Sequence, residues 1–82
     1  MESTAWAVYP NPTDDGWINL RGPVQRTSTL WEVFDAKGSR LTSGWMQPGL
    51  TPALQLPAVK GHYVVRWTLD SGETVSRKVV RR

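Results

Sequence analysis

The sequence contains no cysteine and only one histidine, His62. Without cysteine there is no disulfide framework, no zinc ribbon and no thiol nucleophile. This absence does not assign a compartment, because many exported proteins also lack cysteine. A single imidazole cannot form a pair of histidine ligands for a metal ion. The commonest metal centres and cysteine chemistry are therefore excluded, and we expect no cofactor.

Long apolar runs and long helical patterns are also missing. No apolar stretch approaches the roughly 18 residues that a membrane-spanning helix needs, so no stable membrane insertion is expected. The first four residues, Met1–Thr4, are polar and carry no basic head, so any export signal is expected on a longer parent chain. No segment of ten or more residues keeps helical spacing without glycine or proline. This pattern indicates an all-β protein.

The net charge of +3 is not evenly distributed. The last six residues hold four basic side chains, whereas the other 76 residues hold six basic and seven acidic ones. A basic tail can contact nucleic acid or anionic lipid. Nucleic-acid binding would also need exposed aromatic residues interleaved with the basic ones, and that pattern is weak here. A solvated last strand is the favoured interpretation, and no nucleic-acid partner is expected.

Short strand patterns run along the whole chain. The clearest lies between Gly61 and Leu69, where alternate residues from Tyr63 onward are aromatic or aliphatic. The turn at Asp70–Gly72 and a last strand at Thr74–Val80 then complete a hairpin. Other strands are expected at Trp6–Tyr9, Trp17–Arg21, Thr29–Asp35, Ser39–Met46 and Thr51–Leu56. About seven short strands with regular turns predict an immunoglobulin-like β-sandwich of antiparallel strands, with a small barrel as the alternative.

Several local features refine this expectation. The strand at Thr29–Asp35 carries apolar residues on both faces and is expected to be central. Asp35–Gly38 is expected to form a tight hairpin turn with Gly38 in the left-handed conformation. Gly44 suggests a bulge or an edge strand. At 82 residues the chain fits one domain, with residues 1–5 as a linker lead-in and residues 6–82 as the sandwich.

Catalytic constellations are hard to assemble from these residues. A set of Ser71, His62 and Asp70 fails on distance, because His62 and Asp70 lie at opposite ends of one strand, about 25 Å apart at ordinary strand rise. Asp14 and Asp15 lack the spaced oxygen ligands of a calcium loop, and turn chemistry explains them better. We therefore expect a protein that is not an enzyme and has no metal site.

The five tryptophans are unusual for this length. Trp31 and Trp67 fall on faces that are predicted to point inward, and we expect them in the core. Trp17 and Trp45 lie beside turns and could be exposed as a platform for sugar rings. Packing or strand-edge cover is the favoured role, because tryptophan buries a large area while its N–H needs a partner.

The order of the motifs is more specific than any single motif. A strand ending in Tyr9-Pro10-Asn11-Pro12 precedes the hairpin that contains Asp35 and Gly38. The motif with Gly61 and Tyr63 follows, and Lys78-Val79-Val80 lies close to the last residue. This series, from Val8 to Arg82, resembles the type A C-terminal sorting domain of the type IX secretion system of Gram-negative bacteria. Arg81 and Arg82 extend past the usual terminal motif, and the tryptophan count is high for the family.

The resemblance implies a seven-stranded immunoglobulin-like sandwich that acts as an address for export. Its partners would be an outer-membrane β-barrel shuttle, the translocon of the type IX system, and a surface cysteine protease that acts as sortase. The parent protein would pass through the periplasm and reach the cell surface or the medium. The family motif positions would be Tyr9, Pro10, Asn11, Pro12, Asp35, Gly38, Gly61 and Tyr63. The candidate recognition residues for the translocon would be Lys78, Val79, Val80, Arg81 and Arg82.

Two other functions remain open at this point. A fibronectin-like or carbohydrate-binding accessory module would show Trp17 and Trp45 exposed on one surface with a groove between them. In a structural linker domain, removal of the last six residues would change the stability of the domain but not the place to which the parent protein is delivered. An open sandwich also permits a weak dimer through an edge strand.

Overall fold

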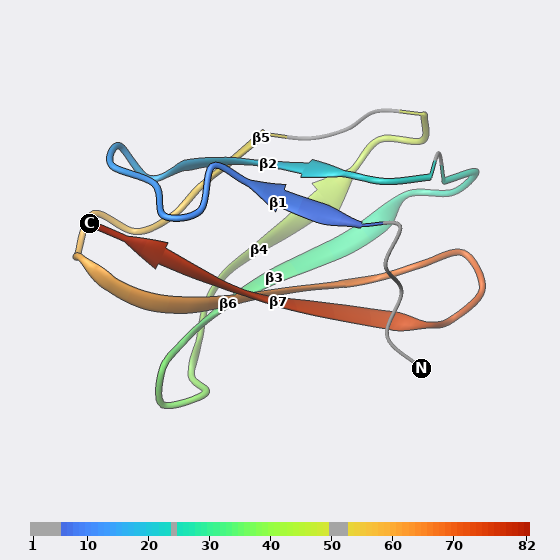
Figure 1. The fold of residues 1–82 in the computed structure, drawn as a ribbon. Coiled ribbons are helices and arrows are strands. Elements are labelled where there is room, and N and C mark those ends of the chain that lie inside the picture. The colour runs from blue at the N-terminus through green and yellow to red at the C-terminus, as the bar shows by residue number, and fades with distance from the viewer. Residues whose placement is uncertain (1–5, 24, 50–52) are drawn as a thin grey trace.

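The computed structural model describes residues 6–23, 25–49 and 53–82, and these residues form strands and turns without a helix. Two antiparallel sheets face each other (Figure 1), with strand orders β1-β2-β5 and β4-β3-β6-β7. The predicted all-β sandwich of seven antiparallel strands is confirmed, and the immunoglobulin-like arrangement stays a prediction. The strands are β1 (Ala7–Tyr9), β2 (Trp17–Arg21), β3 (Thr29–Asp35), β4 (Arg40–Met46), β5 (Ala53–Gln55), β6 (Gly61–Thr68) and β7 (Thr74–Arg81).

The predicted strand bounds agree with the structure to within one or two residues. β2 and β3 have the bounds that the sequence predicts, whereas β6 ends one residue earlier and β7 continues one residue further, to Arg81. The predicted strand at Thr51–Leu56 overlaps β5, and its first two residues lie outside the described part of the chain. The predicted lead-in at residues 1–5 also lies outside it. No described segment forms a helix that could cross a membrane.

The core lies between the two sheets and follows from the alternation of the strands. On β2, Ile18 and Leu20 point inward and have no exposed surface. On β6, the residues predicted to point inward are buried, namely Tyr63, Val65 and Trp67. The prediction that Trp31 lies in the core is wrong, because Trp31 is half-buried and packs against the core residues. The buried apolar residues are Trp6, Ile18, Leu20, Val33, Met46, Leu54, Leu56, Tyr63, Val65, Trp67, Val75 and Val79.

β3 is central in the larger sheet, as predicted, because it pairs with both β4 and β6. β4 is an edge strand, which was one of the two readings of Gly44. The bulge lies elsewhere, where Leu41 is an extra residue between two successive pairs of β3 and β4. Gly44 lies opposite Trp31, and a Cβ on Gly44 would lie 2.5 Å from the indole ring. The glycine therefore provides the space that this ring occupies.

The hairpin between β3 and β4 is closed by Asp35 and Gly38. Gly38 has a φ of 88°, in the left-handed region that favours glycine. The amide of Gly38 donates to the carbonyl of Asp35. The Asp35 carboxylate accepts the amides of Lys37 and Ser39, both at 2.9 Å. The turn predicted from the sequence is confirmed, with the aspartate side chain organising its backbone.

One end of the sandwich, which we call the loop end, contains the β6–β7 turn and the connection from β2 to β3. The Asp70 carboxylate accepts the amide of Arg26 at 2.5 Å and the hydroxyl of Thr27 at 2.6 Å. The hydroxyl and the amides hold the pKa of Asp70 below its usual value. Nearby in the core, Trp6 makes an edge contact with Trp67, with ring centroids 5.4 Å apart.

Candidate functional site

Two sequence motifs from opposite ends of the chain meet at the other end of the sandwich, which we call the terminal end. β7 is the outermost strand of the larger sheet, and β6 covers one of its two edges. The segment Asn11–Asp14 lies along the other edge, close to the C-terminus (Figure 1). The motif Tyr9-Pro10-Asn11-Pro12 and the terminal motif Lys78-Val79-Val80 therefore form one structural unit.

The side chain of Asn11 acts as a strand partner for β7. Its Nδ2 donates to the carbonyl of Lys78 at 2.9 Å, and its Oδ1 accepts the amide of Val80 at 3.0 Å. A carboxamide carries one donor and one acceptor side by side, as a peptide group does. Asn11 thus satisfies two backbone groups of an edge strand that would otherwise need water or another chain.

Thr13 continues this pairing with its backbone. Its amide donates to the carbonyl of Val80 at 2.8 Å, and its carbonyl accepts the amide of Arg82 at 2.9 Å. The Thr13 side chain is fully buried, and its hydroxyl donates to the carbonyl of Trp17 at 2.9 Å. β7 is consequently held on both edges from Lys78 to Arg81.

Asp14 and Asp15 have different roles beside this pairing. Asp15 Oδ1 accepts the amide of Trp17 at 2.9 Å, and this bond is the main cause that lowers the pKa of Asp15. The turn interpretation of Asp15 is thereby supported. Asp14 forms an ion pair with Arg82, with 3.1 Å between Oδ1 and Nε. Both side chains are exposed, so this pair contributes little to stability.

Arg81 points inward and closes the terminal end from inside. Its Nη1 lies 3.3 Å from the carbonyl oxygen of Leu56 and 3.0 Å from that of Pro57, and it donates to both. A Cβ on Gly16 would lie 2.1 Å from the same nitrogen. The glycine is therefore required for the close approach of the guanidinium. Arg81 connects β7 to the loop that follows β5.

The five candidate recognition residues have distinct environments. The side chain of Val79 is in the core, Val80 is half-buried, and Arg81 is half-buried against Leu56 and Pro57. Arg82 pairs with Asp14. Lys78 is exposed on the outer face, and no carboxylate of residues 6–23, 25–49 and 53–82 forms an ion pair with it. Lys78 is thus the terminal side chain most available to a partner.

The remaining motif residues lie at the same end of the sandwich. Asp35 lies opposite Tyr63, and Tyr63 lies opposite Val79, so three strands contribute one row. Gly61 lies opposite Arg81. The Tyr63 hydroxyl donates to the carbonyl of Val59. On β1, Tyr9 is about half exposed, and cis peptide bonds precede the exposed Pro10 and Pro12. Gly61 and Tyr63 thus lie beside β7, whereas Asp35 is separated from β7 by β6, and Gly38 belongs to the β3–β4 turn.

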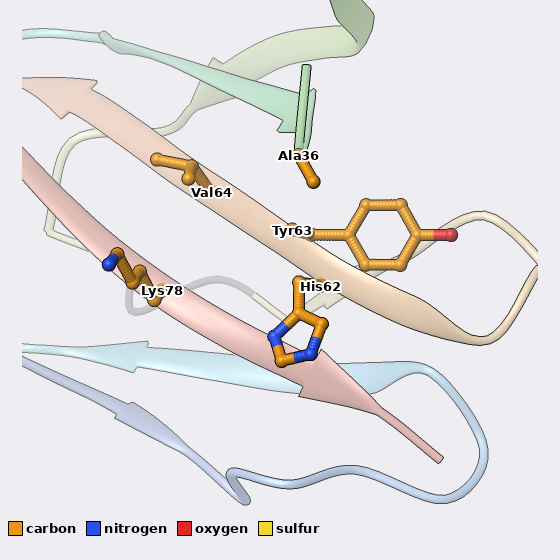
Figure 2. Close-up of a pocket in the computed structure, with 5 residues that line it drawn as sticks. All are labelled: Ala36, His62, Tyr63, Val64 and Lys78. Atoms are coloured by element: carbon orange, nitrogen blue, oxygen red, sulfur yellow. The ribbon is translucent and has the colours of Figure 1, made fainter. Parts of the chain in front are cut away.

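The outer face of the larger sheet has a shallow hollow that sequence reasoning did not identify. It is centred on Val64, and one part has a volume of about 270 Å³. Figure 2 shows Val64 and His62 on β6 with Lys78 on the neighbouring β7. The sequence pattern does place these three side chains on outward-facing positions. Their grouping depends on the register between strands, which the sequence does not supply.

Two arginines contact the carboxylate of Glu32 on this face. Glu32 lies 3.1 Å from Arg66 and 3.4 Å from Arg40, and the bond from Arg66 is the main cause that lowers the pKa of Glu32. The guanidinium of Arg66 also lies 4.6 Å from the centre of the Phe34 ring. Both arginines are therefore engaged with neighbours on their own sheet.

The tryptophans are scattered over the molecule. Trp67 is fully buried, as predicted, and Trp6 is buried as well, which the sequence did not indicate. Trp17 and Trp45 are 47% and 65% exposed. They lie on the outer faces of different sheets, since Trp17 belongs to β2 and Trp45 to β4. They form no shared surface for a sugar.

No family model matches the sequence, and no curated protein matches it either. The resemblance to sorting domains accordingly depends on the motifs quoted above. What the structure adds is the contact of the Asn11 segment and of β6 with β7.

Proposed function

We propose that this chain is a non-catalytic sorting domain that directs its parent protein through the type IX secretion machinery. The observation that carries the proposal is the contact between Asn11 and the backbone of Lys78 and Val80. It joins two of the motifs on which the resemblance is based. A family signature with both parts in one structural unit is a stronger argument than either part alone.

The geometry suits an address that is read on a folded domain. A receptor that recognises a chain end needs that end in a fixed position, because ordering a loose tail costs conformational entropy on binding. Here Asn11 and Thr13 hold β7 on one edge while β6 holds the other. Lys78 is then displayed on the outer face and the C-terminus at the terminal end.

The partners in this proposal are an outer-membrane β-barrel shuttle and the translocon, followed by a surface cysteine protease that acts as sortase. The cut would fall in or before Glu2–Ala5. The parent protein would cross the periplasm and end at the cell surface or in the medium, with this domain removed.

The tryptophan arrangement disfavours the carbohydrate-binding alternative. A sugar platform on this sandwich would need Trp17 and Trp45 on one surface, whereas they lie on the outer faces of different sheets. A single exposed indole leaves little area for stacking. The sorting function remains the better supported of the two.

The test is a transplant of the address. The full chain is fused to the end of a fluorescent reporter that carries an inner-membrane signal peptide, in a bacterium with a working type IX system. We expect the reporter at the surface or in the medium with the natural sequence. Lys78→Ala should leave the domain folded but hold most of the reporter in the periplasm. Arg21→Ala, an exposed basic residue on the smaller sheet, serves as the matched control and should be exported normally.

Two results would count against the proposal. A reporter that stays in the periplasm with the natural sequence, while the domain is folded, would reject the sorting function. Normal export of the Lys78→Ala fusion would remove Lys78 from the recognition surface.

A further inference from the structure

The hollow on the outer face arises from the register of three strands. Phe34 on β3 lies opposite Val64 on β6, and Val64 lies opposite Lys78 on β7. A valine between two longer side chains leaves a depression with an apolar floor. His62 and Ala36 border one part of it, and Asp35, Arg66 and Ser76 border an adjoining part of about 310 Å³.

The charges around this floor are unequal. Arg40 and Arg66 share the carboxylate of Glu32, and the carboxylate of Asp35 also borders the hollow, so two positive charges face two negative ones. Lys78 has no such partner within the part of the chain that the structure describes. The hollow thus combines an apolar floor of Val64 and Phe34 with one uncompensated ammonium group and the neighbouring imidazole of His62.

The charge and the apolar floor of the hollow favour a peptide over nucleic acid or an anionic membrane. Nucleic-acid binding rests on several simultaneous phosphate contacts, and anionic membranes are bound by clusters of about four to eight basic residues. One uncompensated ammonium provides neither. A peptide with one carboxylate and one apolar side chain fits both the charge and the floor.

We infer that this hollow is the docking site for an acidic peptide segment of a protein partner. A carboxylate of that segment pairs with the Lys78 ammonium, and an adjacent apolar side chain lies on Val64 and Phe34. The inference rests on the proposed function, because Lys78 takes part in both the export signal and the hollow. It assigns an acidic and apolar character to the receptor segment that binds the domain. The register places the site on rigid strands, so it exists before the partner arrives.

The experiment is a selection of random short peptides, displayed on phage, against the full chain. The chain with Lys78→Glu serves for counter-selection. We expect the enriched peptides to carry an aspartate or glutamate next to an aliphatic or aromatic residue. The best peptide should shift the backbone NMR signals of His62, Val64 and Lys78, with smaller changes at Trp45 on the same sheet.

A double-mutant cycle then tests the proposed ion pair. Lys78→Ala should weaken binding of that peptide by about two- to fivefold, as expected for a solvent-accessible ion pair. A peptide in which the carboxylate is replaced by an amide should bind the natural sequence with a similar loss of affinity. Lys78→Ala combined with this peptide should lose little more affinity than either change alone. Arg21→Ala should bind as the natural sequence does, and thermal unfolding should show all variants folded.

Several outcomes would overturn the inference. They are enriched peptides without acidic residues, equal enrichment on the Lys78→Glu chain, or no enrichment at all. Another outcome is that the chain binds phosphatidylglycerol vesicles or a single-stranded oligonucleotide through Lys78 and binds no acidic peptide. That result would reject the acidic-peptide site in favour of the ligand that binds. Export that depends on Lys78 without acidic-peptide binding rejects this docking site and keeps the sorting function. Acidic-peptide binding at the hollow without export rejects the sorting function and keeps the site.

Discussion

The two ends of the sandwich are closed by different means. At the loop end, Trp6 packs against Trp67, and a Cβ on Gly22 would lie 2.3 Å from the Trp6 ring, so the contact needs a glycine there. At the terminal end the contacts are polar and directional: Asn11 and Thr13 complete the pairing of β7. Apolar packing supplies most of the stabilisation per residue, whereas hydrogen bonds fix position. We expect the loop end to govern stability and the terminal end to govern where the C-terminus lies.

The largest effect is expected at the loop end. Trp6→Ala should lower the free energy of unfolding by about 3–5 kcal/mol, because it removes a buried indole and leaves a cavity. Chemical denaturation of the full chain measures this loss. Trp17→Ala is the control, since its indole is 47% exposed, and should change stability by about 0.5 kcal/mol or less. Equal losses in the two variants would contradict the assignment of Trp6 to the core.

A smaller effect is expected at the terminal end. Asn11→Ala removes the donor to Lys78 and the acceptor for Val80, and should cost about 1–2 kcal/mol. Asn19→Ala is the matched control, because its side chain makes one long bond of 3.3 Å to Tyr9. Denaturation under the same conditions should show a clearly smaller change for Asn19→Ala. A change at Asn11 no larger than at Asn19 would mean that the side-chain pairing with β7 adds nothing.

The smallest effect is expected at the exposed carboxylate of Asp70 and depends on pH. Its pKa is lowered, chiefly by the Thr27 hydroxyl, so the folded state favours the ionised form. The resulting stability is present above the ordinary value of 3.8 and is lost as the pH falls through the lower folded value. Asp70→Asn should therefore be less stable than the natural sequence at neutral pH, and the difference should shrink below about pH 4. Thermal unfolding from neutral to acidic pH measures it, and a constant difference would contradict the prediction.

Local patterns in the sequence predict most of the fold. The alternation in β2 and β6 is set by a buried and an exposed face, and residues such as Ile18 and Val65 follow it directly. The turn at Asp35–Gly38 depends on residues within four positions, so its chemistry is visible in the sequence. The central position of β3 was predicted from apolar residues on both of its faces, and Gly44 indicated either a bulge or an edge position for β4.

The long-range contacts were not predictable in the same way. The proline-rich segment was interpreted as the end of a strand, while Asn11 also pairs with Lys78, 67 residues away. Gly22 admits the ring of Trp6, a contact that nothing in the neighbouring sequence indicates. The hollow around Val64 depends on the register of β3, β6 and β7. Each of these features is set by tertiary packing and leaves no periodic signal in the sequence.

The most direct test of the account is amide hydrogen exchange at Val80. Its N–H points away from β6 and is bonded to Asn11, whereas that of the adjacent Val79 faces β6 by the alternation of an antiparallel ladder. We predict that Val80 is protected in the natural sequence and exchanges much faster in Asn11→Ala, while Val79 keeps its protection. A Val80 amide that exchanges freely in the natural sequence, or equally slowly in both proteins, would contradict the claim that Asn11 holds the chain end in place.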